Sequence, residues 1–103
     1  MSEHTLEKEI QAKGLNAPRL DPTHINNTIV AEAYYVFPDT TLTVCCLTLK
    51  NGFTVTGESA SASVANFNAD IGKGIAKENA RDKIWMLEGY LLKESLWNQK
   101  KKQ

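Results

Sequence analysis

The chain contains 103 residues, 42% of them hydrophobic, and its 12 Lys and Arg residues balance its 12 Asp and Glu residues. A chain of this length forms a single domain, so we expect one small α+β unit over residues 1–103. A net charge of zero argues against a protein that coats DNA or RNA, because such proteins need an excess of positive charge. The two cysteines are adjacent and provide no disulfide framework, and no apolar run is long enough to cross a bilayer. We therefore expect a cytoplasmic protein with neither a membrane nor a nucleic acid as partner.

The N-terminal third of the chain carries two helix patterns. Leu6–Lys13 predicts a short helix that stops at Gly14, and residues 1–20 as a whole predict a weakly structured helix and connector. Asp21 followed by Pro22 is a typical helix start, with the acid as N-cap. The spacing of the next apolar residues predicts that this second helix runs to about Tyr34: Ile25, Ile29 and Ala33. Tyr34–Phe37 either extends that helix or begins a strand.

The middle of the chain predicts an antiparallel β-hairpin over Thr40–Ser59, with Asn51-Gly52 as a two-residue turn. Such a turn pairs Lys50 with Phe53 and gives one apolar core face: Leu42, Val44, Cys46, Phe53 and Val55. The other face is half apolar: Thr41, Thr43, Cys45, Leu47, Leu49, Thr54, Thr56 and Glu58. Because a two-stranded hairpin is marginal alone, we expect helices or a partner subunit against it. The apolar residues of the second face are candidates for a subunit interface: Cys45, Leu47 and Leu49.

A long helix is predicted from Asn68, its N-cap, to about Asn98, packed on the sheet and followed by a frayed basic tail over residues 99–103. Its apolar residues keep mostly to one stripe: Ile71, Ile75, Ala76, Ala80, Ile84, Leu87, Leu91 and Leu96. Gly72, Ala76 and Ala80 recur every four residues, a spacing that lets a sheet or helix approach closely. The large aromatic residues are further interface candidates: Trp85, Tyr90 and Trp97.

The chain offers no motif for catalysis or for a metal. The two histidines are isolated, and Cys45-Cys46 lacks the spacing with which two thiolates bind one zinc ion. No nucleophile stands beside a base in a known pattern. We therefore expect neither an enzyme nor a cofactor nor a metal site.

One helical stripe favours an anionic ligand. Lys73, Lys77 and Arg81 fall four residues apart, and a guanidinium suits bidentate phosphate contact. The alternative is a solvated face on which Glu78 and Asp82 pair with these cations. Glu58, on the hairpin, is either a solvated edge residue or a ligand contact.

A series of ordered motifs resembles a known family. They begin with Leu42-Thr43-Val44-Cys45, Leu47–Phe53 and Gly57–Ala60, and continue through Asn66-Phe67, Ile71-Gly72, Ile75-Ala76, Asn79-Ala80-Arg81, Ile84-Trp85 and Leu87–Leu92. Together they strongly resemble the small tailed-phage proteins named after gene products forty-nine and sixty-six of two phages, over roughly Pro18 to Leu92. The resemblance implies a phage-encoded protein made in an infected bacterium and supplies no catalytic residues. The matching residues reflect either a shared fold or a shared site: Gly57, Glu58, Ser59, Asn66, Phe67, Asn79, Ala80 and Trp85.

Two binding functions follow as hypotheses. In the first, a homo-oligomer sequesters a small anionic nucleotide-type host signal and thereby counters a host defence. Its candidate ligand residues are Glu58, Ser59, Asn66, Phe67, Lys73, Lys77, Asn79 and Arg81. In the second, the chain is a protein–protein module that inhibits or redirects a host protein or defence complex. Homo-oligomerisation is expected in either case, because so short a chain has a small core.

Overall fold

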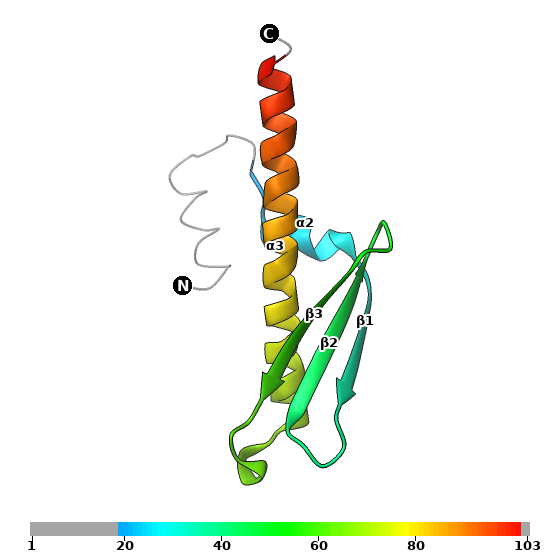
Figure 1. Cartoon of the computed structure of the whole chain (residues 1–103), viewed down its shortest axis with the longest axis vertical. Coiled ribbons are helices and arrows are strands. Elements are labelled where there is room, and N and C mark those ends of the chain that lie inside the picture. The colour runs from blue at the N-terminus through cyan, green and yellow to red at the C-terminus, as the bar shows by residue number, and fades with distance from the viewer. Residues whose placement is uncertain (1–18, 102–103) are drawn as a thin grey trace.

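The computed structural model describes residues 19–101, and the side chains of residues 19–100 (Figure 1). The helix predicted at Leu6–Lys13 lies outside the described residues. In chain order the elements are α2 (Pro22–Thr28), β1 (Ile29–Val36), β2 (Leu42–Leu49), β3 (Thr54–Ala60), a 3-10 turn at Val64–Asn66, and α3 (Ala69–Lys101). The three strands form one antiparallel sheet in the order β1-β2-β3, and α3 packs against β3 and β2. The α+β fold with a long C-terminal helix on the sheet is therefore confirmed.

Helix α2 starts as predicted but is much shorter. The Asp21 side chain accepts a hydrogen bond from the backbone N–H of His24 at 2.8 Å, and Pro22 occupies the first turn. The helix ends at Thr28, so the predicted extension to Tyr34 is wrong. The following residues are mostly β-branched or aromatic, and as a strand they gain a hydrogen-bonded ladder with β2. The stabilisation from this ladder is greater than the preference for helix that the spacing of three apolar residues indicates.

The hairpin exists, but its turn has three residues instead of two. Leu49 N–H donates to the Phe53 carbonyl at 2.8 Å, and Gly52 N–H donates to the Leu49 carbonyl at 2.9 Å. Gly52 has a φ of 89°, the left-handed conformation that closes a three-residue loop. The strands consequently pair with Leu47 opposite Val55 and not with Thr48 opposite Val55.

This shift by one residue reverses the predicted faces of β2, because side chains alternate along a strand. The core is formed by Cys45, Leu47 and Leu49, with Val55 on β3. Val55 is the predicted core residue that the structure confirms. Leu42, Val44 and Cys46 alternate with the buried residues of β2, so they lie on the sheet face away from α3, which we call the open face. Phe53 is 56% exposed.

Small residues allow α3 to approach the sheet closely, as predicted. Ala76, Ala80 and Ile84 are completely buried against it. A Cβ atom added to Gly57 on β3 would lie 2.8 Å from the carbonyl carbon of Asn79 and closer still to the backbone of Ala76 and Ala80. Strand and helix backbones are therefore in direct contact at Gly57.

Helix α3 begins where the sequence predicted and runs beyond the sheet. The Asn68 side chain accepts from the backbone N–H groups of Asp70 at 3.0 Å and Ile71 at 3.1 Å, which makes it the N-cap. The helix continues to Lys101, past the predicted end at Asn98, and its 33 residues span about 50 Å. Its C-terminal turns extend past the sheet (Figure 1). The predicted apolar stripe is only partly buried. Leu91 is exposed, and so are Ile71 and Ile75, which lie near the start of the helix beside β3.

Candidate functional site

The eight predicted ligand residues divide between two flanks of α3. Five of them share one hollow of about 340 Å³ beside β3, which we call the β3-side hollow: Glu58, Ser59, Asn66, Phe67 and Asn79. The other three, Lys73, Lys77 and Arg81, do not line it. One chain therefore brings five of the eight predicted residues together and places the three cations elsewhere.

The polar groups of the β3-side hollow fasten β3 to α3. Ser59 Oγ donates to the carbonyl of Gly72 at 2.7 Å, and Asn79 Nδ2 donates to the carbonyl of Glu58 at 2.8 Å. Thr41 Oγ1 donates to the carbonyl of Ser61 at 2.6 Å. Glu58 itself lies opposite Val44, so its side chain belongs to the open face. These contacts explain two of the matching polar residues, Ser59 and Asn79, by the fold, and none of them brings a cation into the hollow.

The three predicted cations face β1 or their own helix. Lys77 Nζ lies 2.8 Å from Glu32 Oε2, and the hydrogen bond from this ammonium lowers the pKa of Glu32. Lys73 Nζ lies 5.7 Å from the centroid of the Tyr34 ring, a cation–π distance. Arg81 is 5% exposed, and its Nη1 lies 3.2 Å from Glu78 Oε1. The pairing with Glu78 was the alternative interpretation of this stripe.

Burial governs the titratable groups between β1 and β2. It raises the pKa of Tyr34 to about 12, and the neighbouring Cys45 and Glu32 act in the same direction. Burial also raises the pKa of the Cys45 thiol. Since the thiolate is the nucleophilic form, this cysteine is a packing residue and is poorly suited to attack a substrate.

The predicted interface residues fall into two groups. Cys45, Leu47 and Leu49 are buried beneath α3 within one chain, which accounts for their apolar character without a second subunit. They were predicted on the wrong face because the register differs by one residue. Trp85 packs against the core, whereas Tyr90 and Trp97 are at least half exposed.

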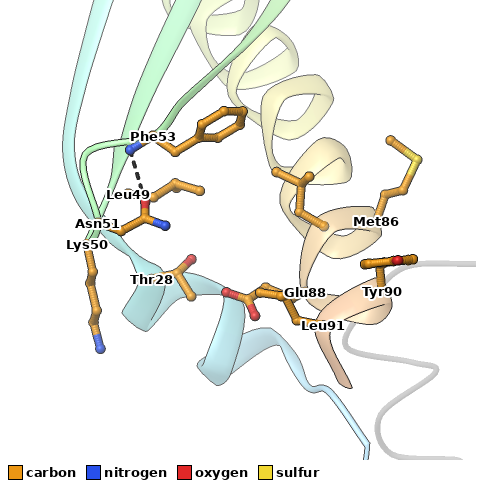
Figure 2. A pocket seen from close by; sticks show the side chains of 10 residues that line it. Thr28, Leu49, Lys50, Asn51, Phe53, Met86, Glu88, Tyr90 and Leu91 are labelled. Atoms are coloured by element: carbon orange, nitrogen blue, oxygen red, sulfur yellow. Dashed lines mark hydrogen bonds between the residues drawn. The ribbon is translucent and has the colours of Figure 1, made fainter. Parts of the chain in front are cut away.

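An apolar groove that sequence reasoning missed lies between the hairpin tip and α3. It has a volume of about 560 Å³ and is lined by Thr28, Leu49, Lys50, Asn51, Phe53, Met86, Leu87, Glu88, Tyr90 and Leu91. Figure 2 shows the Phe53 ring pointing from the hairpin tip toward α3, with Met86 and Tyr90 on the helix. The exposed fractions of its large side chains are 56% for Phe53, 69% for Met86, 69% for Tyr90 and 59% for Leu91.

The groove was missed because Phe53 was assigned to the core and its helical wall lies more than thirty residues away in the sequence. One signal was present. Met86 and Tyr90 stand four residues apart, outside the stripe that packs on the sheet. Large apolar residues on a second helical face indicate a surface that is not covered by the sheet.

Within residues 19–101, no helix has the length and apolar character needed to cross a membrane. The same residues contain no cluster of three His, Cys, Asp or Glu side chains that could hold a metal ion.

Comparison with known proteins places the chain in a family. No curated protein and no solved structure matches it. The model of the phage protein (N4 Gp49/phage Sf6 gene 66) family matches residues 20–96, which is most of the chain and nearly the span of the motifs described above. The chain therefore belongs to this family of bacteriophage proteins.

Proposed function

We propose that this phage protein is an accessory protein that acts by binding, and that its apolar groove receives apolar side chains of a host protein. One observation carries the proposal. Four large apolar side chains, all more than half exposed, converge on one groove of about 560 Å³: Phe53, Met86, Tyr90 and Leu91. Apolar patches of this kind on a small protein mark interaction sites.

The composition of the groove fits a protein as its occupant. Tyr, Phe and Met are enriched at the centres of protein interfaces, and Met adapts its shape to a partner. Polar residues surround the apolar centre, with Lys50 and Asn51 at the hairpin tip and Glu88 on the helix. Oε2 of Glu88 lies 3.6 Å from Nε2 of His24 on α2. An apolar centre with a polar rim is the usual arrangement of a protein interface.

The test compares three baits in a bacterial host lysate: the wild-type protein, a Tyr90→Ser/Leu91→Ser variant and an Ile71→Ser control. Ile71 is an exposed apolar residue of the same helix, at its other end and outside the groove. We expect the wild type and the control to retain a host protein that the groove variant loses, and the purified partner to bind directly with the same preference. Equal retention of every protein by all three baits would contradict the proposal.

A second candidate is counter-defence by sequestration of a small anionic nucleotide-type signal. It is favoured by the β3-side hollow, where five predicted ligand residues meet. The engagement of Lys77 by Glu32 and of Arg81 by Glu78 weakens it. Thermal unfolding with cyclic dinucleotides and ADP-ribose as probes tests it, since a ligand at 100 times its dissociation constant adds about 2.7 kcal/mol. The increase in stability should disappear in the Asn66→Ala variant. If no probe raises the stability of the wild type, this candidate is rejected.

A further inference from the structure

The two edges of the sheet differ in how they are covered. At the β3 edge, Asn79 on α3 donates to the outward carbonyl of Glu58, and Gly57 brings the helix backbone against the strand. At the β1 edge, the pairing of Phe37 N–H with the Leu42 carbonyl at 3.1 Å shows which residues bond to β2. By the alternation of an antiparallel ladder, the N–H and C=O groups of Glu32, Tyr34 and Val36 then point outward. None of these groups bonds to another residue in the part of the chain that the structure describes.

The central residues of β1 carry little of the usual protection of an exposed edge. Natural edge strands carry charges, prolines, β-bulges or a covering element that prevent pairing with another chain. The one register shift between β1 and β2 falls between Ile29 and Ala31, at the start of the strand. β1 has eight residues, Ile29–Val36, with no proline and one charged residue, Glu32. Lys77 engages that carboxylate at 2.8 Å. A long edge of this kind is a template for strand addition.

We infer that the β1 edge pairs with β1 of a second copy of this chain, antiparallel and centred on Ala33. The two-fold axis then sets Ala33 opposite Ala33 of the second copy, so two small exposed side chains meet at the centre. Glu32 faces Tyr34 of the second copy, and all outward groups of Glu32 and Tyr34 are bonded. A centre at Glu32 would set two carboxylates opposite each other, which is unfavourable.

The arrangement joins two three-stranded sheets into one of six strands. Because the axis is perpendicular to the sheet, both α3 helices lie on the same side, and the two open faces form one continuous surface. Tyr35 lies beside Ala31 of the second copy on that surface, since residues of the same parity share a face. The apolar groove between the hairpin tip and α3 is not used and stays accessible in each copy.

Cross-linking tests the register. Ala33→Cys is made in a Cys46→Ser background, because Cys46 is paired with Ala33 across the strands and would compete for the new thiol. At the centre of the two-fold pair the new cysteines are directly opposite, so mild oxidation should yield a disulfide-linked dimer. Thr56→Cys in the same background, exposed on β3 at the far edge of the same face, should stay uncross-linked.

Association in solution supplies the second measurement. We expect native mass spectrometry and light scattering to report a dimer of the wild-type chain at micromolar concentration. Ala33→Lys, which sets two ammonium groups opposite each other, should weaken the dimer about fivefold at low salt, whereas Thr56→Lys should not. A monomeric wild type would overturn the inference. So would a dimer that Ala33→Lys and Thr56→Lys affect equally and that Ala33→Cys does not cross-link.

Discussion

Gly57→Ala tests the contact that holds the helix to the sheet. The added Cβ would lie 2.8 Å from the carbonyl carbon of Asn79, whereas ordinary contacts begin at 3.4 Å, so α3 must retreat by more than the difference of 0.6 Å. All three nearest atoms are backbone atoms of α3, which no side-chain rotation can move. The cost is therefore at the upper end of overpacking, about 3 kcal/mol. A chain of this size has a stability of roughly 5–15 kcal/mol, so one methyl group removes a large share.

Chemical and thermal unfolding, followed by far-UV circular dichroism, measure the effect. We expect the unfolding midpoint to fall by roughly 12–24 °C, at about 4–8 °C per kcal/mol for a domain of this size. Gly74→Ala is the matched control, because nothing lies within 4 Å of its Cβ position on α3. Alanine there should stabilise the helix by about 0.5–1 kcal/mol. A Gly57→Ala protein as stable as the wild type would refute the direct backbone contact.

Three further predictions each concern one side chain. Asn68→Ala removes the N-cap of α3 and should cost about 1 kcal/mol in urea unfolding, with Asn68→Asp restoring it. Thr43→Val should raise the free energy of unfolding by about 1 kcal/mol, because the buried Thr43 hydroxyl has no hydrogen-bond partner among the described residues; a loss of stability would reveal a bond. The pKa of Tyr34 rises from 10.0 to about 12 on folding, so the unfolded chain releases this proton first. Stability should therefore fall as pH rises from 10 to 12, and the fall should be smaller in Tyr34→Phe.

Local chemistry made several features of the fold predictable. Asp21 and Asn68 are both N-caps in the structure, because each side chain bonds a backbone N–H three residues later. Gly72, Ala76 and Ala80 share the helical stripe that packs on the sheet. Helix starts and close-packed small residues depend on neighbours within one or two turns, so their pattern is visible in the sequence.

The errors came from features that the local pattern does not determine. An Asn-Gly pair allows loops of two or three residues, and the choice of loop sets the face of every residue on β2. Ile29–Val36 became a strand because β2 offered it a partner, which no window of eight residues records. The grouping of the candidate ligand residues could not be predicted for the same reason. Whether Lys77 or Asn79 faced β1 or β3 depended on where α3 crosses the sheet.

The conformation of Gly52 has a consequence for recognition. A Cβ atom added to Gly52 would have no neighbour within 4 Å, so space does not require a glycine there. Its φ of 89° does, because this conformation closes the three-residue loop that places Phe53 on the same face as Val55, toward α3. A residue with a Cβ atom resists this conformation, so it would strain the loop and displace the adjacent Phe53 from its place beside the groove. For the binding proposed above, a substitution at Gly52 should therefore weaken capture of a partner, although Gly52 does not line the groove and the helical wall stays intact.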